Sequence, residues 1–427
     1  MQALRQSAKV YRSSKQYPEA IKIYNQLWNI ENESLNDKWL GWEYADSLKH
    51  NGDLERALYI CKIIHENNHD FKYINDLYAW CIYEIYFKKI DYNNANIDKL
   101  IEQAEIVTKL VIQDKSSPFE SVVFQILKLL KSKPSFPANK ILYWINKIDV
   151  TLVSDTPYHY EIKGIKRESE SRKEMYYSLK TKTFLNLKLF SECIQCCDEA
   201  FAEIKNFHHG NEIWIQLRKA ISISNLGQTT EALNMLMDLV LQKDHWTLFL
   251  EIAKLYYTIG EVNKALIFLY RAALTPDDPK MKVELYYIIG CILEKSGNCE
   301  YAYKHLLLAK NIRLKQGWNI PSKLASHLEQ LKVNQAIQSV SHEALKNYWL
   351  EQIKTLIGNR DGIISQLMAN GKIGFIKSDK ESVFFKASSI ISNQKIRIGS
   401  RVNFCLIDSY DRKKNVKSKE ASYITVY

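Results

Sequence analysis

Apolar residues recur at intervals of three and four over most of the chain, which is the pattern of helices that bury one face. The helices are predicted to form antiparallel pairs, because a small residue returns at the same place in successive copies of the pattern. These small residues are Ala20, Ala57, Ala232, Ala265 and Ala302, separated by 33 or 37 residues between neighbouring copies. A small side chain at this place lets the two helices of a pair approach closely.

Turn-forming residues support the same division of the chain. Asn51-Gly52-Asp53, Leu226-Gly227, Ile259-Gly260 and Ser296-Gly297-Asn298 each stand a few residues before one of the small residues, where a helix must end and reverse. Helix pairs with a period near 34 residues resemble tetratricopeptide repeats. The resemblance implies a mostly α-helical chain that forms a right-handed superhelix of about seven to eight hairpins.

The repeats are degenerate between about residues 70 and 200, although helices are still predicted there. They cover 77–90, 97–112, 119–131 and 140–148, with a further hairpin through Tyr177, Phe184, Cys193 and Cys197. The charged stretch 161–173 predicts an exposed loop or a helix start. The array is expected to occupy residues 1–322, and helical spacing over 323–357 predicts a cap for its exposed end.

From residue 358 onward the pattern changes to short alternating segments, which predict strands. Five strands are expected, over 362–368, 373–377, 382–386, 401–407 and 421–427. Five strands in a segment of this length fit a small closed barrel. Alternation also assigns faces, with Val383 and Phe385 pointing inward and Phe384 outward.

The order of motifs in this segment resembles a cold-shock domain, which is a type of OB-fold. Residues 371–376 resemble the first nucleic-acid-binding motif of that family, and 383–387 resemble the second. The resemblance implies a barrel that binds RNA or single-stranded DNA by stacking bases on aromatic rings. Of the aromatic residues that stack on bases in that family, only Phe375 and Phe384 are present here, because Gln366 and Ile373 replace two of the others. Lys386 and Ala387 replace the His and Phe of the second motif.

The net charge of +11 is concentrated in the same segment, since residues 360–427 hold 13 Lys and Arg against 6 Asp and Glu. We therefore expect contacts to phosphates to supply much of the binding, which makes it salt-dependent. The candidate phosphate contacts are Lys372, Lys377, Lys386, Arg360, Arg397, Arg401, Arg412, Lys413 and Lys414. The alternative is a barrel that docks a protein or only keeps the chain soluble.

The repeat resemblance also implies a concave groove that holds a protein or peptide. The groove positions are basic or aromatic, which suits an acidic peptide or a nucleic-acid backbone. They are Arg5, Lys9, Arg12, Trp42, Lys49, Lys182, Lys254, Tyr257 and Tyr287. The alternative is that they are ordinary solvated residues of amphipathic helices. The family's clamp for chaperone tails is not expected, because Arg5 and Lys9 occupy the places of its Lys and Asn.

Two short motifs resemble the sequences of known metal or redox sites. His65-Glu66-Asn67-Asn68-His69 matches a zinc-protease helix, but Asn-Asn favours a helix end, and the metal would need a continuous helix. Cys193, Cys196 and Cys197 occupy packing positions of a repeat, so all eight cysteines are interpreted mainly as reduced core residues. We expect no metal, no cofactor and no enzymatic activity.

Composition agrees with a folded chain, since 46% of the residues are hydrophobic and only 14 are Gly and 8 Pro. Neither a signal peptide nor an apolar stretch of membrane-spanning length is evident, so a cytoplasmic location is expected. Abundant Asn, Ile, Lys and Tyr indicate an AT-rich, bacterial genome. The expected function is an adaptor that binds a protein through the array and RNA or single-stranded DNA through the barrel. A pure protein-interaction scaffold is the alternative, and homo-oligomers through the degenerate middle are left open.

Overall fold

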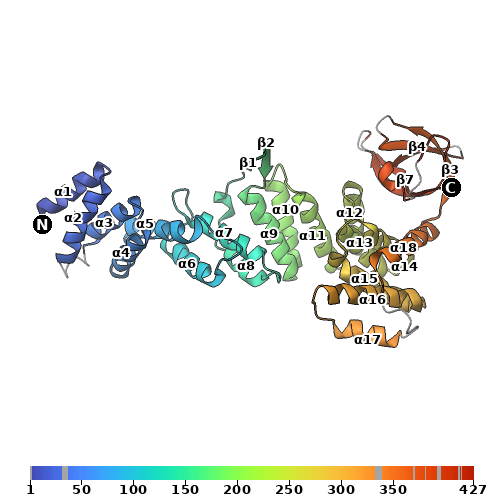
Figure 1. Ribbon diagram of the computed structural model, residues 1–427, viewed down its shortest axis with the longest axis horizontal. Helices are drawn as coiled ribbons and strands as arrows, with labels where there is room; N and C mark the ends of the chain where they lie inside the picture. The colour runs from blue at the N-terminus through green and yellow to red at the C-terminus, as the bar shows by residue number, and fades with distance from the viewer. Residues whose placement is uncertain are drawn as a thin grey trace. The chain divides into compact units, whose positions relative to one another are not determined.

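The computed structural model describes residues 2–30, 37–331, 339–368, 371–379, 381–391, 396–411, 414 and 416–427. The chain divides into two compact units, the first ending at Ile215 and the second beginning at Gln216. Figure 1 shows helices throughout both units and a β-barrel at the carboxyl end of the second. No helix within the described ranges has the length and apolar character needed to cross a bilayer.

The first unit consists of paired helices and one β-hairpin. Its helices are α1 (Gln2–Ser13), α2 (Tyr17–Ile30), α3 (Lys38–His50), α4 (Leu54–Asn67), α5 (Lys72–Ile82), α6 (Ile97–Leu110), α7 (Phe119–Lys131), α8 (Ala138–Ile145), α9 (Arg172–Asn186) and α10 (Phe190–Glu203). A π-helical turn, η2 (Tyr83–Phe87), extends α5, and a 3₁₀ turn, η3 (Val150–Leu152), follows α8. The hairpin strands are β1 (Tyr158–Ile162) and β2 (Ile165–Ser169).

The predicted small positions lie in the interfaces between helices. Ala20 and Ala57 are fully buried, and Tyr24 and Ile64 pack in the same core cluster. The start of α3 is capped, since the carboxylate of Asp37 accepts hydrogen bonds from the N–H groups of Trp39 and Leu40. Close packing between small and large residues therefore sets the spacing of these hairpins.

The stretch 161–173 was expected to be a loop or a helix start, and the first part of that prediction is wrong. Residues 158–169 form the antiparallel β1–β2 hairpin, in which Ile162 pairs with Ile165. Lys163 and Gly164 both have positive φ, 51° and 77°, which makes the two-residue loop that matches the twist of paired strands. The helix start lies later, at Arg172.

The second unit continues the helix pairs. Its helices are α11 (Asn211–Asn225), which contains the boundary of the two units, α12 (Thr229–Gln242), α13 (Trp246–Thr258), α14 (Val262–Leu274), α15 (Val283–Lys295), α16 (Cys299–Lys315), α17 (Ser322–Gln330) and α18 (His342–Ile357). A 3₁₀ turn, η4 (Pro279–Lys282), precedes α15. In the described part of the chain, seven pairs of neighbouring helices pack together, within the predicted range: α1–α2, α3–α4, α5–α6, α7–α8, α9–α10, α13–α14 and α15–α16.

Helix α18 packs on α14, α15 and α16. The Trp349 side chain is fully buried, and its ring stacks on that of Tyr286 with centroids 6.0 Å apart and planes at 5°. His342, at the start of α18, hydrogen-bonds through Nε2 to the carbonyl oxygen of Ala273 at 3.0 Å. The segment after the last repeat is therefore a docked helix whose aromatic side chains join the core of three others.

The carboxyl-terminal barrel is closed. Its strands are β3 (Arg360–Leu367), β4 (Ile373–Ser378), β5 (Glu381–Lys386), β6 (Arg401–Asp411) and β7 (Val416–Val426), with a 3₁₀ turn, η5 (Ala387–Ser389), after β5. They are arranged in the order β3-β4-β5-β7-β6, with β3 paired to β6 and β5 parallel to β7. The core holds Ile364, Ile376, Val383, Phe385, Val402, Phe404, Ala421 and Ile424.

The observed strands match the predicted ones in place and order, and the inward faces of Val383 and Phe385 are confirmed. Gly374 shows why β4 fits so closely, because a Cβ there would lie 2.7 Å from the Phe385 ring. The predicted fold class, mostly α with repeated helical hairpins followed by a five-stranded barrel, is confirmed.

Candidate functional site

An aromatic row crosses three neighbouring strands on the outside of the barrel. Phe375 of β4 lies directly opposite Phe384 of β5, with ring centroids 5.9 Å apart and planes at 70°. Gln366 of β3 lies beside Phe375 in the register of β3 and β4. Both rings are half-buried, whereas the next residues, Ile376 and Phe385, point into the core. The row offers two apolar rings and one amide on a single outer face.

A second row lies two residues further along β4 and β5, about 7 Å away, and three residues further along β3, where a β-bulge shifts the register. Register partners place Ser382, Lys377, Ile363 and Arg401 side by side across β5, β4, β3 and β6. All four residues are exposed, and Ile363 retains 48% of its accessible surface. Within the described ranges, neither Lys377 nor Arg401 takes part in an ion pair. The face therefore sets two cationic side chains beside the aromatic row.

The remaining predicted cations of the barrel have different surroundings. The ammonium of Lys386 lies 2.9 Å from the carboxylate of Glu420, which is nearly buried and also accepts a hydrogen bond from Ser409 at 2.8 Å. Arg360 lies 3.8 Å from Glu381, and Lys372 is exposed just before β4. Lys386 is therefore largely neutralised where it stands, although the sequence predicted it as a phosphate contact.

Two further predicted cations in the described part of the chain lie close to the ends of β6. Arg397 precedes β6, where its N–H bonds to the hydroxyl of Ser400. Lys414 follows β6, with its N–H bonded to the carboxylate of Asp411. Arg412 and Lys413 lie outside the described residues. Of the predicted barrel residues, the strand register brings Phe375, Phe384, Lys377, Lys386 and Arg401 onto one surface, and among these three cations Lys386 is the one paired with a carboxylate.

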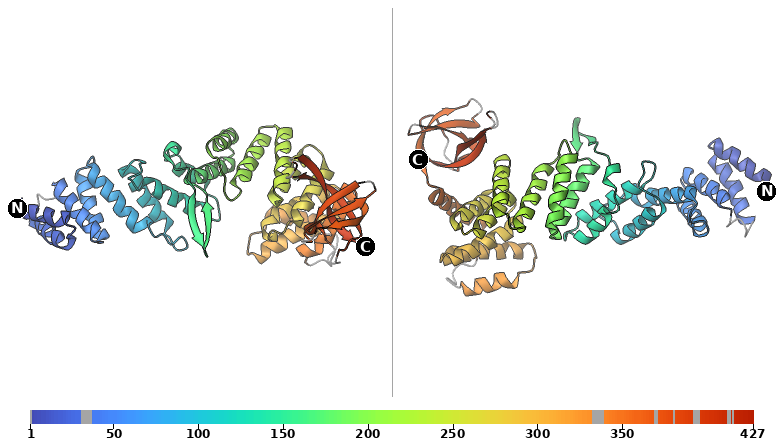
Figure 2. Two further views of the ribbon diagram at one scale, coloured as in Figure 1. Left: turned by 90° about the horizontal axis from the view of Figure 1, so that it is seen from above. Right: turned by 180° about the vertical axis from the view of Figure 1, so that it is seen from behind.

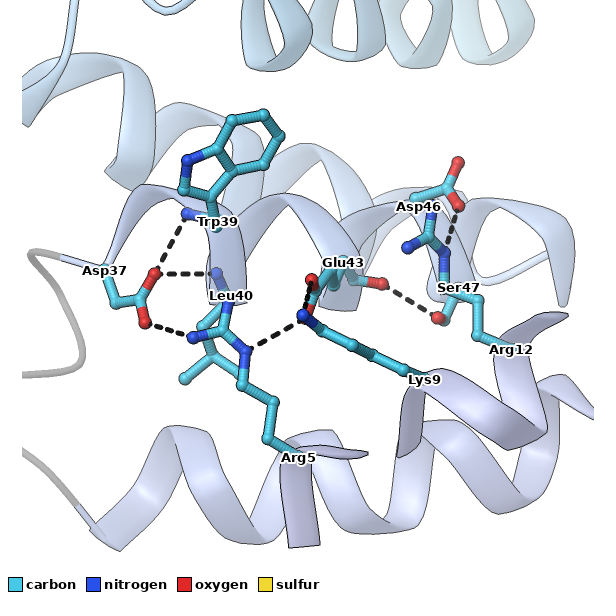
Figure 3. A network of polar contacts seen from close by, with 9 residues as sticks. All are labelled: Arg5, Lys9, Arg12, Asp37, Trp39, Leu40, Glu43, Asp46 and Ser47. Carbon is cyan, nitrogen blue, oxygen red and sulfur yellow. Dashed lines mark hydrogen bonds and ion pairs between the residues drawn. The ribbon is translucent and has the colours of Figure 1, made fainter. Parts of the chain in front are cut away.

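The predicted groove residues near the amino end form a network with carboxylates of the next helix pair (Figure 3). Arg5 Nε lies 3.2 Å from Glu43 and Lys9 Nζ also lies 3.2 Å from it, while Arg5 Nη1 lies 2.6 Å from Asp37. Arg12 Nε lies 2.8 Å from Asp46. Although burial alone would lower the pKa of Arg5, Glu43 and Asp37 raise it. These cations therefore bind α3 to α1, and they leave little positive charge for an acidic peptide.

The other predicted groove residues also contact neighbouring side chains, either on their own helix or on another segment of the array. Lys49 lies 3.5 Å from Glu84, and Lys254 lies 2.9 Å from Glu251 and 3.6 Å from Glu284. The ring of Tyr287 meets His327 edge-on at 5.9 Å. The remaining contacts are Lys182 over Phe136 at 4.4 Å and Lys295 donating to the hydroxyl of Tyr257 at 3.2 Å.

An aromatic patch that the sequence reasoning largely missed lies beside this network. Trp39 and Tyr73 keep 43% and 55% of their surface exposed, and their rings are 5.2 Å apart. Trp42 and Phe71 complete the patch, with the guanidinium of Arg12 over Trp42 at 4.4 Å. Only Trp42 was predicted. The sequence did indicate part of the patch, because Trp39 and Trp42 are one helical turn apart and so lie on the same side of α3. The presence of Phe71 and Tyr73 in the patch depends on how α5 packs, which a local pattern does not show.

Residues 65–69, which match the sequence of a zinc-protease helix, do not form a continuous helix. Helix α4 ends at Asn67, so His69 lies beyond it, and His65 Nδ1 is 2.7 Å from the side-chain oxygen of Asn75. Among the described residues, no three His, Cys, Asp or Glu side chains gather as metal ligands would. Cys193, Cys196 and Cys197 are buried as predicted, but Cys299 is exposed, which corrects the expectation for that residue.

Comparison with known protein families gives a match to part of the chain. A family described as a domain of unknown function, DUF7017, matches residues 213–349, from α11 into α18. No curated protein matches the sequence.

Several solved structures are similar to the chain. A tetratricopeptide repeat protein from Parabacteroides merdae shows 13% identity and a TM-score of 0.31, over 78% of this chain and 98% of that one. The human IFIT1 dimer with m7Gppp-AAAA shows 14% identity and a TM-score of 0.39, over 82% of this chain and 76% of that one.

Proposed function

We propose that the chain is a non-enzymatic adaptor that binds RNA or single-stranded DNA on the outer face of its barrel and a protein through its repeat array. The observation that carries the proposal is the aromatic row of Phe375 and Phe384 beside the cations Lys377 and Arg401. A single strand needs flat rings for its bases and positive charges for its phosphates. This face offers both at a spacing of about 7 Å.

The topology of the barrel supports the same proposal. The order β3-β4-β5-β7-β6, with β5 parallel to β7, fits the OB-fold that the motifs resemble. In that fold the second and third strands carry the nucleic-acid face, and Phe375 and Phe384 lie on those two strands. Two rings rather than a full row mean that phosphate contacts supply much of the affinity.

The repeat array supplies the protein-binding part of the proposal. Exposed aromatic clusters of this size are typical of interfaces, because large rigid rings bury much surface at a small entropic cost. Trp39 and Tyr73 form such a cluster, with cations stacked on neighbouring rings. A weak nucleic-acid module tethered to a bound partner acts at high effective concentration, which accounts for joining the two parts in one chain.

The test measures binding of the full chain to a labelled single strand, of either RNA or DNA, by fluorescence anisotropy at moderate salt. Replacing both Phe375 and Phe384 by Ala is expected to weaken binding about tenfold or more, since each stacked base contributes about 1–3 kcal/mol. The matched control removes two exposed rings of the array, Tyr59→Ala with Tyr92→Ala, and should leave the affinity unchanged. Equal binding by the barrel variant and the parent would exclude this face as the nucleic-acid site.

The second candidate function is a protein scaffold without nucleic-acid binding, favoured by the Lys386–Glu420 pair that removes one cation from the face. Affinity isolation of the intact chain, with and without nuclease, separates the two functions. In the adaptor, Trp39→Ala with Tyr73→Ala loses the protein partner and keeps the nucleic acid, whereas the Phe375 and Phe384 variant does the reverse.

A further inference from the structure

The β1–β2 hairpin projects away from the helices of the first unit, as Figures 1 and 2 both show. At its base, Glu168 of β2 lies 3.5 Å from the ring of His208. The other strand residues are exposed, apart from Tyr160 and Ser169, which are half-buried. Two strands alone are only marginally stable in water, so additional strands would stabilise this element.

One face of the hairpin carries its tyrosine and isoleucine side chains together with Ser169 and Arg167. Its register pairs Tyr158 with Ser169, Tyr160 with Arg167 and Ile162 with Ile165, so these six side chains share a face. Tyr158, Ile162 and Ile165 keep 74%, 46% and 59% of their surface exposed. The opposite face carries His159, Glu161, Lys166 and Glu168, with His159 Nδ1 3.4 Å from Glu168.

The two edges of the hairpin differ. In a hairpin closed by a two-residue loop, the residue pair beside the loop exchanges backbone hydrogen bonds, and so does every second pair after it. The backbone N–H and C=O groups of Ile162, Tyr160 and Tyr158 therefore point toward β2. His159 and Glu161 therefore turn their backbone N–H and C=O groups outward along the β1 edge. The β2 edge carries Lys166 and Arg167, charges of the kind that discourage further pairing there.

The β1 edge is complementary to itself. When two copies run antiparallel with Tyr160 opposite Tyr160 of the second copy, His159 faces the second Glu161 and Tyr158 faces the second Ile162. Each pair is favourable, because an imidazole that can donate a hydrogen bond meets a carboxylate on one face and apolar side chains meet on the other. The same register sets the outward-facing residues opposite each other, so four backbone hydrogen bonds form. A shift by one pair would set Glu161 opposite Glu161 or His159 opposite His159.

We propose that two copies of this chain associate through their β1 edges and form a continuous four-stranded antiparallel sheet. The proposal does not depend on the proposed function of the barrel. The faces that carry the tyrosine and isoleucine side chains of the two hairpins become one surface, and the loops point in opposite directions. Because the contact involves one short strand from each copy, the expected result is a reversible dimer with a dissociation constant on the order of micromolar.

The test is sedimentation equilibrium of the full chain over a range of concentrations, with two matched proline variants. Glu161→Pro removes an outward N–H from the β1 edge, and Lys166→Pro removes one from the β2 edge of the same register pair. The first is expected to weaken the dimer about tenfold or more, because two hydrogen bonds per dimer are lost. The second should leave the dimer unchanged. A chain that stays monomeric at all concentrations, or equal effects of the two variants, would overturn the proposal.

The two-fold axis of the proposed dimer passes between the two copies of Tyr160, so a cysteine at this position gives an independent test of the register. In a pair without hydrogen bonds the two Cα atoms are about 4.5 Å apart, which permits a disulfide. Tyr160→Cys, in a background with the exposed Cys299 changed to Ser, is expected to form a disulfide-linked dimer on mild oxidation. Lys166→Cys in the same background should stay monomeric on a non-reducing gel. Cross-linking of both variants to the same extent would contradict the register.

Discussion

The indole Nε1 of Trp349 donates a hydrogen bond to Nε2 of His305, with 2.7 Å between the two nitrogens. The other ring nitrogen of His305, Nδ1, lies 2.6 Å from the carbonyl oxygen of Tyr301. Nδ1 therefore carries the proton, and Nε2 accepts from the indole. Because both side chains are fully buried, this contact joins α18 to α16 inside the core.

Replacing Trp349 by Phe is expected to loosen α18. The smaller ring keeps most of the apolar contact with Tyr286 but leaves Nε2 of His305 buried without a donor, at a cost of about 1–3 kcal/mol. Hydrogen–deuterium exchange of α18 peptides measures the loss, because exchange there reports local opening. Trp318→Phe, at a ring with 43% of its surface exposed, is the control and should leave exchange of α18 unchanged.

Acid is predicted to release the same helix. Burial lowers the pKa of His305 to about 4, whereas an unfolded histidine titrates near 6.5. The stabilisation from neutral His305 is therefore complete above about pH 6.5 and is lost as the pH falls toward 4, about 3 kcal/mol in all. Burial also lowers the pKa of His342 on the same helix, which acts in the same direction.

The measurement compares α18 exchange in the parent and in His305→Gln at pH 7.5 and pH 4.5, after correction for intrinsic exchange rates. The variant is expected to open more readily than the parent at pH 7.5 and equally at pH 4.5. A difference between the two proteins that is the same at both pH values would show that protonation of His305 is not the cause.

Features that depend on local pattern were predictable from the sequence. The small residues that mark each hairpin, such as Ala232, Ala265 and Ala302, are fully buried, because only a small side chain fits where two helices cross. Alternation placed the strands of the barrel and the inward side of Val383 and Phe385, since a strand with one buried face permits only one register.

Features that depend on contacts between distant residues were not predictable. The basic groove residues resemble a binding surface in sequence, but Arg5 and Lys9 converge on Glu43, which comes from the next helix pair. The hairpin at 158–169 was missed because its charged residues suggest a loop, while Lys163 and Gly164 specify a turn only if the flanking strands pair. A short segment of sequence does not show that Arg5 and Lys9 pair with Glu43, or that the two strands of the hairpin pair with each other.

Gly290 provides a test of hairpin packing in which helix propensity and packing have opposite effects. Alanine in place of a helical glycine normally stabilises by about 1 kcal/mol. Here a Cβ would lie 2.7 Å from Cγ of Leu306 and 3.2 Å from the carbonyl oxygen of Ala302. Gly290→Ala is therefore expected to destabilise the chain by about 1–2 kcal/mol, measured by urea unfolding.

A double-mutant cycle separates the clash at Gly290 from any other effect of the substitution. In a Leu306→Ala background the obstructing side chain is gone, so Gly290→Ala should become neutral or stabilising. An equal cost of Gly290→Ala in both backgrounds would mean that the Leu306 contact does not limit this position.

The cations of the barrel face can be ranked by the salt dependence of binding. Each phosphate contact on a single strand contributes about 0.7 to the slope of log affinity against log salt. Lys377→Ala and Arg401→Ala are each expected to reduce the slope by about that amount, because both side chains are exposed beside the aromatic row. Lys386→Ala should change it less, since Glu420 lies 2.9 Å from that ammonium.

Glu420→Gln supplies the matched variant for this ranking. It removes the carboxylate that pairs with Lys386 but retains an oxygen that can accept the hydrogen bond of Ser409. The variant should therefore bind the single strand more tightly and with a steeper slope than the parent. Adding Lys386→Ala to it should cancel that gain, because the gain requires the lysine that the substitution released. If Glu420→Gln leaves both affinity and slope unchanged while Lys377→Ala lowers them, phosphates follow the row of Lys377 and Arg401 and do not reach Lys386.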